Sequence, residues 1–334
     1  MIKKECFTAE WIEQVSSELH YNDKNLIEKV IRALSLLEML VKAGCPLVFK
    51  GGTALMLILG KSAHRLSIDI NLELVERKQR DDADIPKSHS KFFYQIAYRN
   101  DTDAQSYILL DVLYEDIHYF RTQQIAIDCP FIRLEGKPLM VTVPSAEDIL
   151  GDKLTAFAPN TTGIPYYKNG RSCSMEIAKQ LYDVGRLFEN VSDLQITKEA
   201  FRKIAVVELS YRSFGTDIGQ VFNDIRQTAL CISTRGKAGE GDFDLIQDGI
   251  IRVKSFMYKQ RYLIDHAIID AARAAYLATL IEKGINEIES YSNNPADIKD
   301  MVIRPSLPNK LNKLRSNLPE AYYYWAKTSE LLEA

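Results

Sequence analysis

The sequence predicts an α+β protein in which a mixed N-terminal half is followed by a mostly helical C-terminal half. Strand-like alternation of apolar and polar residues is clearest at 67–74 and disappears after about residue 195. Beyond that point, apolar residues recur at helical spacing. The length of 334 residues allows two domains, which we place at 1–190 and 191–334.

The N-terminal half yields the following elements in chain order. Segment 23–43 is an amphipathic helix that Asn22 or Asp23 can cap and that Gly44 ends. A buried strand at 47–49, Gly51 and Gly52, and a short helix at 53–59 follow. We expect the next strands at these segments: 67–74, 91–99, 107–114 and, more weakly, 124–127.

The remaining elements are helices separated by loops. The expected helices are 145–158 with Ser145 at its cap, 174–188, 197–209, 217–230, 242–258, 261–285 and 320–333. Loops are expected at 160–172 and at 233–241, and we interpret the second as a linker.

Composition excludes several classes of protein. The 42 Lys+Arg against 45 Asp+Glu give a net charge of −3, which argues against tight, nonspecific binding to long nucleic acid. The five cysteines are widely spaced without a CxxC, which argues against a disulfide framework or a zinc site and favours a cytoplasmic location. No segment reads as a signal peptide or membrane span, and neither a P-loop nor a GxSxG motif is present.

The informative segment is 50–73, KGGTALMLILGKSAHRLSIDINLE. Gly51 and Gly52 let the backbone approach a ligand, and a helix N-terminus offers N–H groups to an anion. An ordinary turn remains the alternative for a Gly-Gly pair. Asp69 and Asn71, two residues apart on a strand, point to the same side, as in proteins that gather Mg²⁺ beside a triphosphate. Asp111 lies in an apolar run, where it either binds metal or a partner or caps a turn at a strand end.

Together these pieces resemble a known family. The run of GGT-A, R-L-S-x-D, LDV, E-D-x-x-x-x-K and Y-D resembles the AbiEii-type nucleotidyltransferases, toxins of bacterial type IV toxin–antitoxin systems with a polymerase-beta-like fold and a small mixed sheet. The resemblance covers about residues 25–190. It implies a cognate antitoxin that acts mostly without tight binding, so we expect no obligate partner.

The resemblance also implies roles for individual residues. Gly51, Gly52 and Thr53 would cradle the nucleotide phosphates, and Arg65 and Ser67 match the nucleotide-binding arginine and serine ahead of the acidic strand. Asp69 matches the first metal-binding carboxylate and Asp111 the third, and Asn71 stands at the second metal-ligand position. Lys153 matches a helix lysine that faces the triphosphate, and Asp183 matches a late aspartate that completes the pocket.

The residues themselves leave alternatives open for the last two. Lys153 has apolar neighbours, which indicates that it points into a cleft, although a surface lysine that extends along apolar side chains is the other interpretation. Asp183 lies four residues after Lys179, so an ordinary helix salt bridge also explains it.

Asn71 departs from the family, which has Asp at this position. An amide oxygen is a poorer ligand for a hard cation than a carboxylate, so we predict weakened Mg²⁺ binding. Three interpretations remain: Asp69 and Asp111 suffice, Glu73 assists them, or the domain binds nucleotide without efficient transfer.

The resemblance, together with these residues, therefore predicts a Mg²⁺-dependent transfer of a nucleotide from an NTP to an acceptor. The resemblance alone makes RNA such as tRNA the candidate acceptor and makes the protein a toxin of a toxin–antitoxin system. A nucleotide sensor or interaction protein is the alternative. Loop 163–171 is interpreted as solvated surface, with steering of a nucleic-acid acceptor as the alternative, and the same two interpretations apply to Lys310, Lys313 and Arg315. Segment 322–325 is interpreted as packing, and an exposed aromatic patch there would indicate a partner surface.

Overall fold

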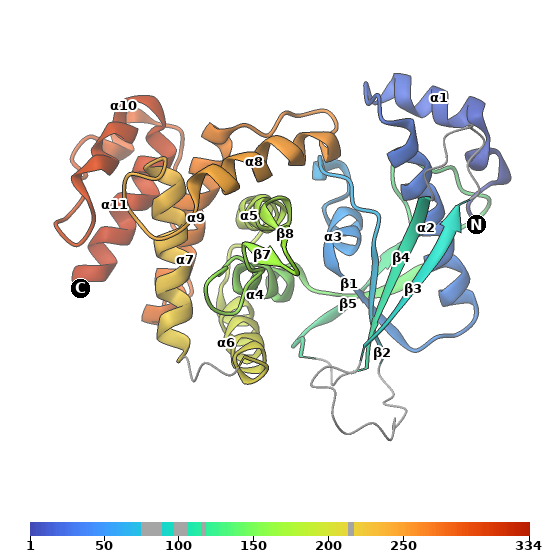
Figure 1. The fold of residues 1–334 in the computed structure, drawn as a ribbon, viewed down its shortest axis with the longest axis horizontal. Coiled ribbons are helices and arrows are strands. Elements are labelled where there is room, and N and C mark those ends of the chain that lie inside the picture. Colours follow the sequence, from blue (N-terminus) through green and yellow to red (C-terminus); the bar gives the residue numbers. More distant parts are fainter. Residues whose placement is uncertain (75–88, 97–105, 115–117, 213–216) are drawn as a thin grey trace. The chain divides into compact units, whose positions relative to one another are not determined.

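The computed structural model describes residues 1–74, 89–96, 106–114, 118–212 and 217–334, and it confirms the α+β class. The chain divides into two compact units (Figure 1). Unit 1 comprises Met1–Ser145 and Ser255–Arg261, and unit 2 comprises Ala146–Lys254 and Tyr262–Ala334. The domain boundary at 190/191 stays a prediction. The first boundary between the two compact units lies at 145/146 instead. Among the described residues, no helix combines the length and apolarity that crossing a membrane requires.

Unit 1 combines helices with a small mixed sheet. Its elements are η1 (Lys4–Phe7), α1 (Ala9–Glu18), α2 (Lys24–Lys42), β1 (Leu47–Lys50), α3 (Gly51–Leu59), η2 (Gly60–Ser62), β2 (Ile70–Leu74), β3 (His89–Ile96), β4 (Ser106–Leu113), β5 (Thr122–Ala126) and β6 (Met140–Pro144). Helix α2 begins where predicted, because the Asp23 side chain accepts a hydrogen bond from Leu26 N at 2.9 Å. It ends before Gly44, whose φ of +72° suits glycine.

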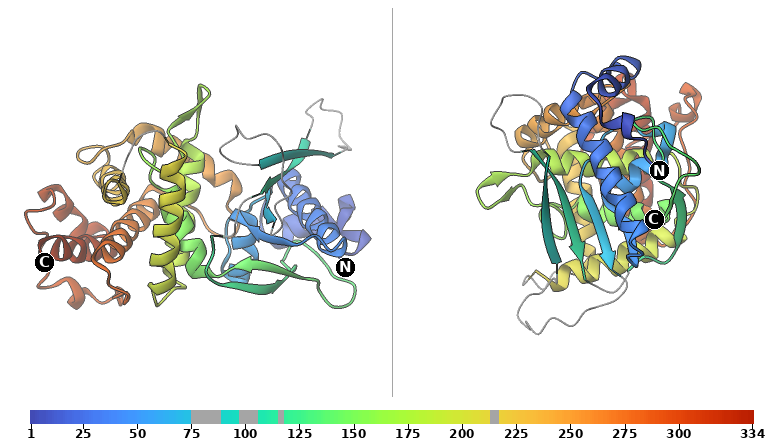
Figure 2. Two further views of the ribbon diagram at one scale, coloured as in Figure 1. Left: turned by 90° about the horizontal axis from the view of Figure 1, so that it is seen from below. Right: turned by 90° about the vertical axis from the view of Figure 1, so that its right-hand side faces the viewer.

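The main sheet has the strand order β1-β2-β4-β3. β2 and β4 are parallel, whereas β1 pairs antiparallel with β2 and β3 pairs antiparallel with β4. Its apolar side chains, among them Phe49, Ile70 and Leu110, join those of α2 in one core, and α2 runs across the sheet (Figure 2, right). The sheet is therefore covered on one side by α2.

A distant segment completes unit 1. In Ser255–Arg261, Phe256 O accepts a hydrogen bond from Leu66 N at 2.8 Å, and Tyr258 N donates to His64 O at 2.9 Å. Tyr258 is 2% exposed and belongs to the core of unit 1. Unit 1 is thus discontinuous in sequence, which periodicity alone does not predict.

Unit 2 is mostly helical. Its elements are α4 (Ala146–Ala156), β7 (Tyr167–Lys168), β8 (Arg171–Ser172), α5 (Ser174–Phe188), α6 (Gln195–Ser210), α7 (Ile218–Ser233), α8 (Phe243–Val253), η3 (Lys254–Phe256, which runs on into unit 1), α9 (Ile264–Lys283), η4 (Pro295–Ile298), η5 (Asn309–Lys313), α10 (Leu314–Asn317) and α11 (Pro319–Glu333). Buried α9 contacts α5, α7, α8 and α11. Gly185 lets α5 approach it closely, since a Cβ there would lie 2.0 Å from Asp270 Oδ1.

The boundaries differ from the predictions in several places. Helix α3 starts at Gly51 rather than at 53, and β2 starts at Ile70 rather than at 67. Strand β6 and the β7–β8 hairpin were not predicted, and α8 ends at Val253 instead of 258. The predicted linker 233–241 is a loop between α7 and α8 inside unit 2. Of the predicted strand 91–99, residues 97–99 lie outside the described residues.

Candidate active site

The turn between β1 and α3 carries the two glycines that the sequence singles out. Gly51 is the first residue of α3 and has φ of +81°, a conformation that other residues adopt at a cost. Within the described residues, the N-cap Lys50 makes no side-chain capping hydrogen bond. The start of α3 therefore presents backbone N–H groups that no cap side chain satisfies, which is the arrangement that suits an anion.

Three predicted site residues lie directly against these glycines. A Cβ on Gly51 would lie 2.6 Å from Asn71 Nδ2. A Cβ on Gly52 would lie 2.8 Å from Ser67 Oγ and 2.9 Å from Nη2 of Arg65, which is buried. The structure thus brings Gly51, Gly52, Arg65, Ser67 and Asn71 together, and a side chain at either turn position would displace the side chains that lie against it.

Thr53 links the turn at Gly51 and Gly52 to Asp69, the residue before β2. Its hydroxyl is fully buried and donates to Asp69 O at 2.7 Å. Because a threonine hydroxyl has one proton, its backbone N–H is the better candidate for a phosphate contact. Asp69 itself is exposed and immediately precedes β2.

A row of polar side chains crosses the four-stranded sheet. Lys50 on β1 is opposite Asn71 on β2, Asn71 is opposite Asp111 on β4, and Lys91 on β3 is opposite Asp111. Cα partners on neighbouring strands project to the same face of a sheet. Asn71 and Asp111 are therefore neighbours, and a cation stands on either side of them.

The two carboxylate oxygens of Asp111 differ in whether they have a partner. Its Oδ2 lies 3.3 Å from Lys91 Nζ, whereas its buried Oδ1 has no hydrogen-bond partner in the part of the chain that the structure describes. Asp111 lies inside β4, with two residues of the strand after it, so it does not cap a turn. An orphaned buried carboxylate oxygen beside an amide fits a hard divalent cation by ligand type.

The donor set is nevertheless sparse. The described residues contain no group of three His, Cys, Asp or Glu side chains arranged to hold a metal. Glu73, which could assist, is 3% exposed and forms an ion pair with Lys50. Of the predicted ligands, Asn71 and Asp111 are thus paired by the sheet, and the ligand role of Asp69 stays a prediction.

Lys153 and Asp183 form a second cluster, within unit 2. Lys153 Nζ lies 3.1 Å from Asp183 Oδ2 and donates to Gln180 Oε1 at 3.0 Å. Both charged side chains are less than 10% exposed, so Lys153 is not a surface lysine. The pairing of Asp183 with Lys153 joins α4 to α5 and gives Asp183 a partner beyond its own helix.

Sequence reasoning missed several residues of the site. The roles of Lys50, Lys91 and Gln180 depend on strand pairing and helix packing, which no local pattern reveals. The same holds for Phe93 and Tyr107, which lie on the Asp111 face, are 57% and 46% exposed, and contact edge to face with ring centroids 5.0 Å apart. Exposed aromatic rings are surfaces on which a nucleobase can stack.

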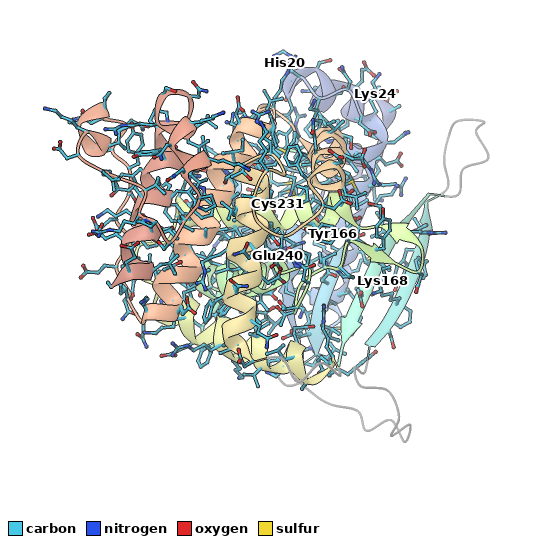
Figure 3. All side chains as sticks on the ribbon, turned by 60° about the vertical axis from the view of Figure 1, so that its left-hand side comes forward. His20, Lys24, Tyr166, Lys168, Cys231 and Glu240 are labelled. Carbon is cyan, nitrogen blue, oxygen red and sulfur yellow. The ribbon has the colours of Figure 1, made fainter. Side chains whose placement is uncertain are left out.

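The loop 163–171 splits into a packed and an exposed part. Tyr166 lies near Cys231 (Figure 3) and next to Gly241, where a Cβ would lie 2.6 Å from the Tyr166 hydroxyl oxygen, and burial raises the pKa of Tyr166 to about 12. Tyr167, Lys168 and Arg171 of the β7–β8 hairpin are exposed, as expected for solvated surface. The predicted packing role of 322–325 is confirmed, since these side chains are buried.

Comparison with known proteins identifies the family. The model of the nucleotidyl transferase AbiEii toxin, type IV TA system, matches residues 34–87 and 73–256, which together span the candidate site in unit 1 and all of α4 to α8. No curated protein matches the chain. The matched residues cover well over half of the sequence and confirm the resemblance on which the site residues were chosen. The chain therefore belongs to the AbiEii nucleotidyl transferase toxin family of type IV toxin–antitoxin systems.

Proposed function

We propose that this protein moves a nucleotide from an NTP to an RNA acceptor in a Mg²⁺-dependent reaction, with tRNA as the first acceptor to test. One observation carries the proposal. The uncapped start of α3 is packed against Arg65 and Ser67 and lies beside the Asn71–Asp111 pair. Membership of a nucleotidyltransferase family supports the same activity.

In this proposal, separate groups of residues bind the phosphates and the base of the NTP. The N–H groups of Gly51 and Gly52, with Arg65 and Ser67 beside them, bind phosphate oxygens. The acceptor hydroxyl attacks the α-phosphorus in line, so that a new O–P bond forms while the bond to pyrophosphate breaks. The Phe93–Tyr107 pair supplies a surface on which a base can stack.

Asp69, Asn71 and Asp111 would hold the cation. When bound there, Mg²⁺ supplies neutralising charge for the attacking and leaving oxygens. The family resemblance implies that Lys153 stabilises the departing pyrophosphate and that Asp183 completes the pocket, and their buried ion pair also gives them a structural role in unit 2. In this proposal the protein acts as the toxin, in the cytoplasm, and its cognate antitoxin counteracts it without an obligate complex.

A second function is favoured by one residue. Because Asn71 replaces a carboxylate between Gly51 and Asp111, a sensor that binds NTP without transferring it is the competing candidate. Such a protein would bind NTP through the α3 turn and leave RNA unlabelled. The two functions therefore differ in transfer and agree in binding.

Labelled transfer separates them. The full chain is incubated with each α-labelled NTP, Mg²⁺ and tRNA, and compared with Asp69→Ala, Asn71→Asp and the matched control Asp128→Ala, an exposed carboxylate elsewhere in unit 1. We expect label on RNA with the native chain and the control, none with Asp69→Ala, and tighter Mg²⁺-dependent NTP binding with Asn71→Asp. NTP binding without label transfer in every divalent metal would establish the sensor instead. Equal metal-dependent NTP binding by the native chain and Asn71→Asp would refute the ligand role of position 71.

A further inference from the structure

A basic hollow lies in unit 2, formed entirely by residues of that unit. It has a volume of about 440 Å³, which lies in the size range of small-molecule sites. Its walls come from the loop after α7, the first turns of α9, and the segment from η5 to the start of α11. The family match ends at residue 256, so two of these three walls lie beyond the matched residues.

The charge of this hollow opposes that of the whole chain. Four cationic side chains line it, Arg235, Lys237, Lys310 and Lys313, and one carboxylate, Asp265. The formal balance of these five groups is +4 − 1 = +3, whereas the whole chain carries −3. A concentration of one sign inside a concave surface focuses its field and attracts ligands of the opposite sign.

The backbone beneath these cations is held in place. Thr234 Oγ1 donates to Leu230 O at 2.9 Å and accepts from Ala238 N at 2.9 Å, which fixes the loop after α7. Lys310 Nζ donates to Lys237 O and so ties η5 to that loop. The fold therefore fixes the backbone positions of these cationic residues before a ligand binds.

Two of the four cationic side chains are already held by partners within the hollow. Arg235 is paired with Asp265 at 2.9 Å, and the ammonium of Lys310 donates to the backbone carbonyl of Lys237. Lys237 and Lys313 are exposed, and within the described ranges neither ammonium has an ion-pair or hydrogen-bond partner. Their charge is thus not neutralised by the protein itself.

The form of these donors indicates the kind of anion. A site for a compact anion uses buried, directional donors, such as backbone N–H groups or a guanidinium fork. Exposed lysines on flexible stems respond to charge more than to geometry, and they suit the phosphates of an extended polyanion.

We propose that the Lys237–Lys313 hollow binds the phosphodiester backbone of the RNA acceptor. This inference rests on the proposed function for the identity of the polymer. It assigns a docking surface for RNA on the helical unit, remote in sequence from the residues of the transfer site. The contacts would carry affinity without base specificity, because phosphates are common to all sequences.

The test measures binding without any NTP. The full chain is titrated into a fluorescein-labelled tRNA transcript by anisotropy over a series of salt concentrations. The pocket variant is Lys237→Ala/Lys313→Ala. Its matched control is Lys137→Ala/Lys299→Ala, which removes two exposed lysines that lie outside the hollow and whose ammonium groups have no partner among the described residues.

We expect the pocket variant to bind tRNA more weakly and to flatten the slope of log K against log salt by about 1.4–1.8, the value for two lost phosphate contacts. The control variant should keep the native slope, and circular dichroism should show all three proteins folded. An unchanged slope in the pocket variant, or an equal change in the control, would overturn the proposal. So would displacement of tRNA by millimolar inorganic phosphate, or by polyglutamate as effectively as by RNA at equal charge.

The outcome is independent of the transfer reaction. If the pocket variant binds tRNA as the native chain does while label transfer proceeds, the docking surface is wrong and the proposed function stands. If the salt slope changes as expected but no NTP labels RNA, the docking surface stands and the transferase is wrong.

Discussion

Gly51 shows how one residue can connect the fold with the candidate chemistry. Its φ of +81° turns the chain from β1 into α3, and its missing side chain leaves room for Asn71. Gly52 makes the same room for Ser67 and Arg65. Close packing and an open backbone are thus obtained from the same two glycines, and a side chain at either position would disturb both.

We predict that Gly51→Ala weakens NTP binding and destabilises unit 1, whereas Gly44→Ala only destabilises. Both glycines have positive φ, +81° and +72°, so the strain of about 1–2 kcal/mol is shared. Only the Gly51 variant adds a contact 2.6 Å from Asn71 Nδ2, since nothing lies within 4 Å of a Cβ on Gly44. Thermal unfolding and titration with a fluorescent NTP measure the two effects. Equal NTP affinity in the two variants would show that the α3 turn does not bind phosphate.

At the level of helices and strands, paired charges hold neighbouring elements together. Lys50 and Glu73 join β1 to β2, Lys91 and Asp111 join β3 to β4, and Lys153 joins α4 to α5 through Asp183. The last pair is almost completely buried, where removing one partner leaves an uncompensated charge. The same pair contains two residues that the family resemblance places in the nucleotide pocket, so stability and catalysis must be measured separately.

The pair can be tested by comparing single and double variants. We expect Lys153→Met to lower the free energy of unfolding by about 3–5 kcal/mol, because Asp183 is then buried without its cation. Lys153→Met/Asp183→Leu should recover most of that loss, since an apolar pair of similar volume is tolerated in a buried site. Denaturant unfolding measures both values, and label transfer is then measured on the folded double variant. Transfer at the native rate by that variant would assign the pair a purely structural role.

The whole chain consists of two units, and each is built from two separate chain segments. Unit 1 includes Ser255–Arg261, which follows α8 in the sequence. Tyr258 of this segment packs in the core of unit 1, edge to face with Phe131 and with 5.2 Å between the ring centroids. Unit 2 contains two chain segments around buried α9. Since the chain passes between the units at three places, 145/146, 254/255 and 261/262, a truncation at residue 190 or 254 would remove part of the core of unit 1.

The two tryptophans of the chain report on the units separately, because Trp11 is buried in unit 1 and Trp325 in unit 2. We predict that Tyr258→Ala lowers the stability of unit 1 by about 3–5 kcal/mol, the usual cost of removing a buried aromatic side chain. The unfolding transition followed in a Trp325→Phe background, which leaves Trp11, should move to lower denaturant. The control is Tyr276→Ala, a tyrosine 1% exposed on α9, which should shift the Trp325 signal in a Trp11→Phe background. A Tyr258 variant that shifts the Trp325 transition more than the Trp11 transition would contradict the assignment of 255–261 to unit 1.

Local patterns were enough to predict the α+β class, the capped helix α2, the Gly-Gly turn and the alternating strand β2. Their spacing along the chain was also enough to select the AbiEii family, which the family comparison confirms. Each of these features depends on residues close in sequence, where backbone geometry and side-chain periodicity act directly. Strand β6 was not predicted and several element boundaries were wrong, because short strands and helix ends depend on packing against the rest of the fold.

The partners of the charged residues could be known only from the folded chain. Lys50 and Glu73 are 23 residues apart, Lys91 and Asp111 are 20 apart, and Lys153 and Asp183 are 30 apart. Strand order, strand direction and register decide which of these side chains meet, and a shift of register by one residue would send each strand side chain to the opposite face. The orphaned oxygen of Asp111 and the basic hollow of unit 2 arise in the same way, because each is made by segments that the sequence keeps apart and that burial of the two cores brings together.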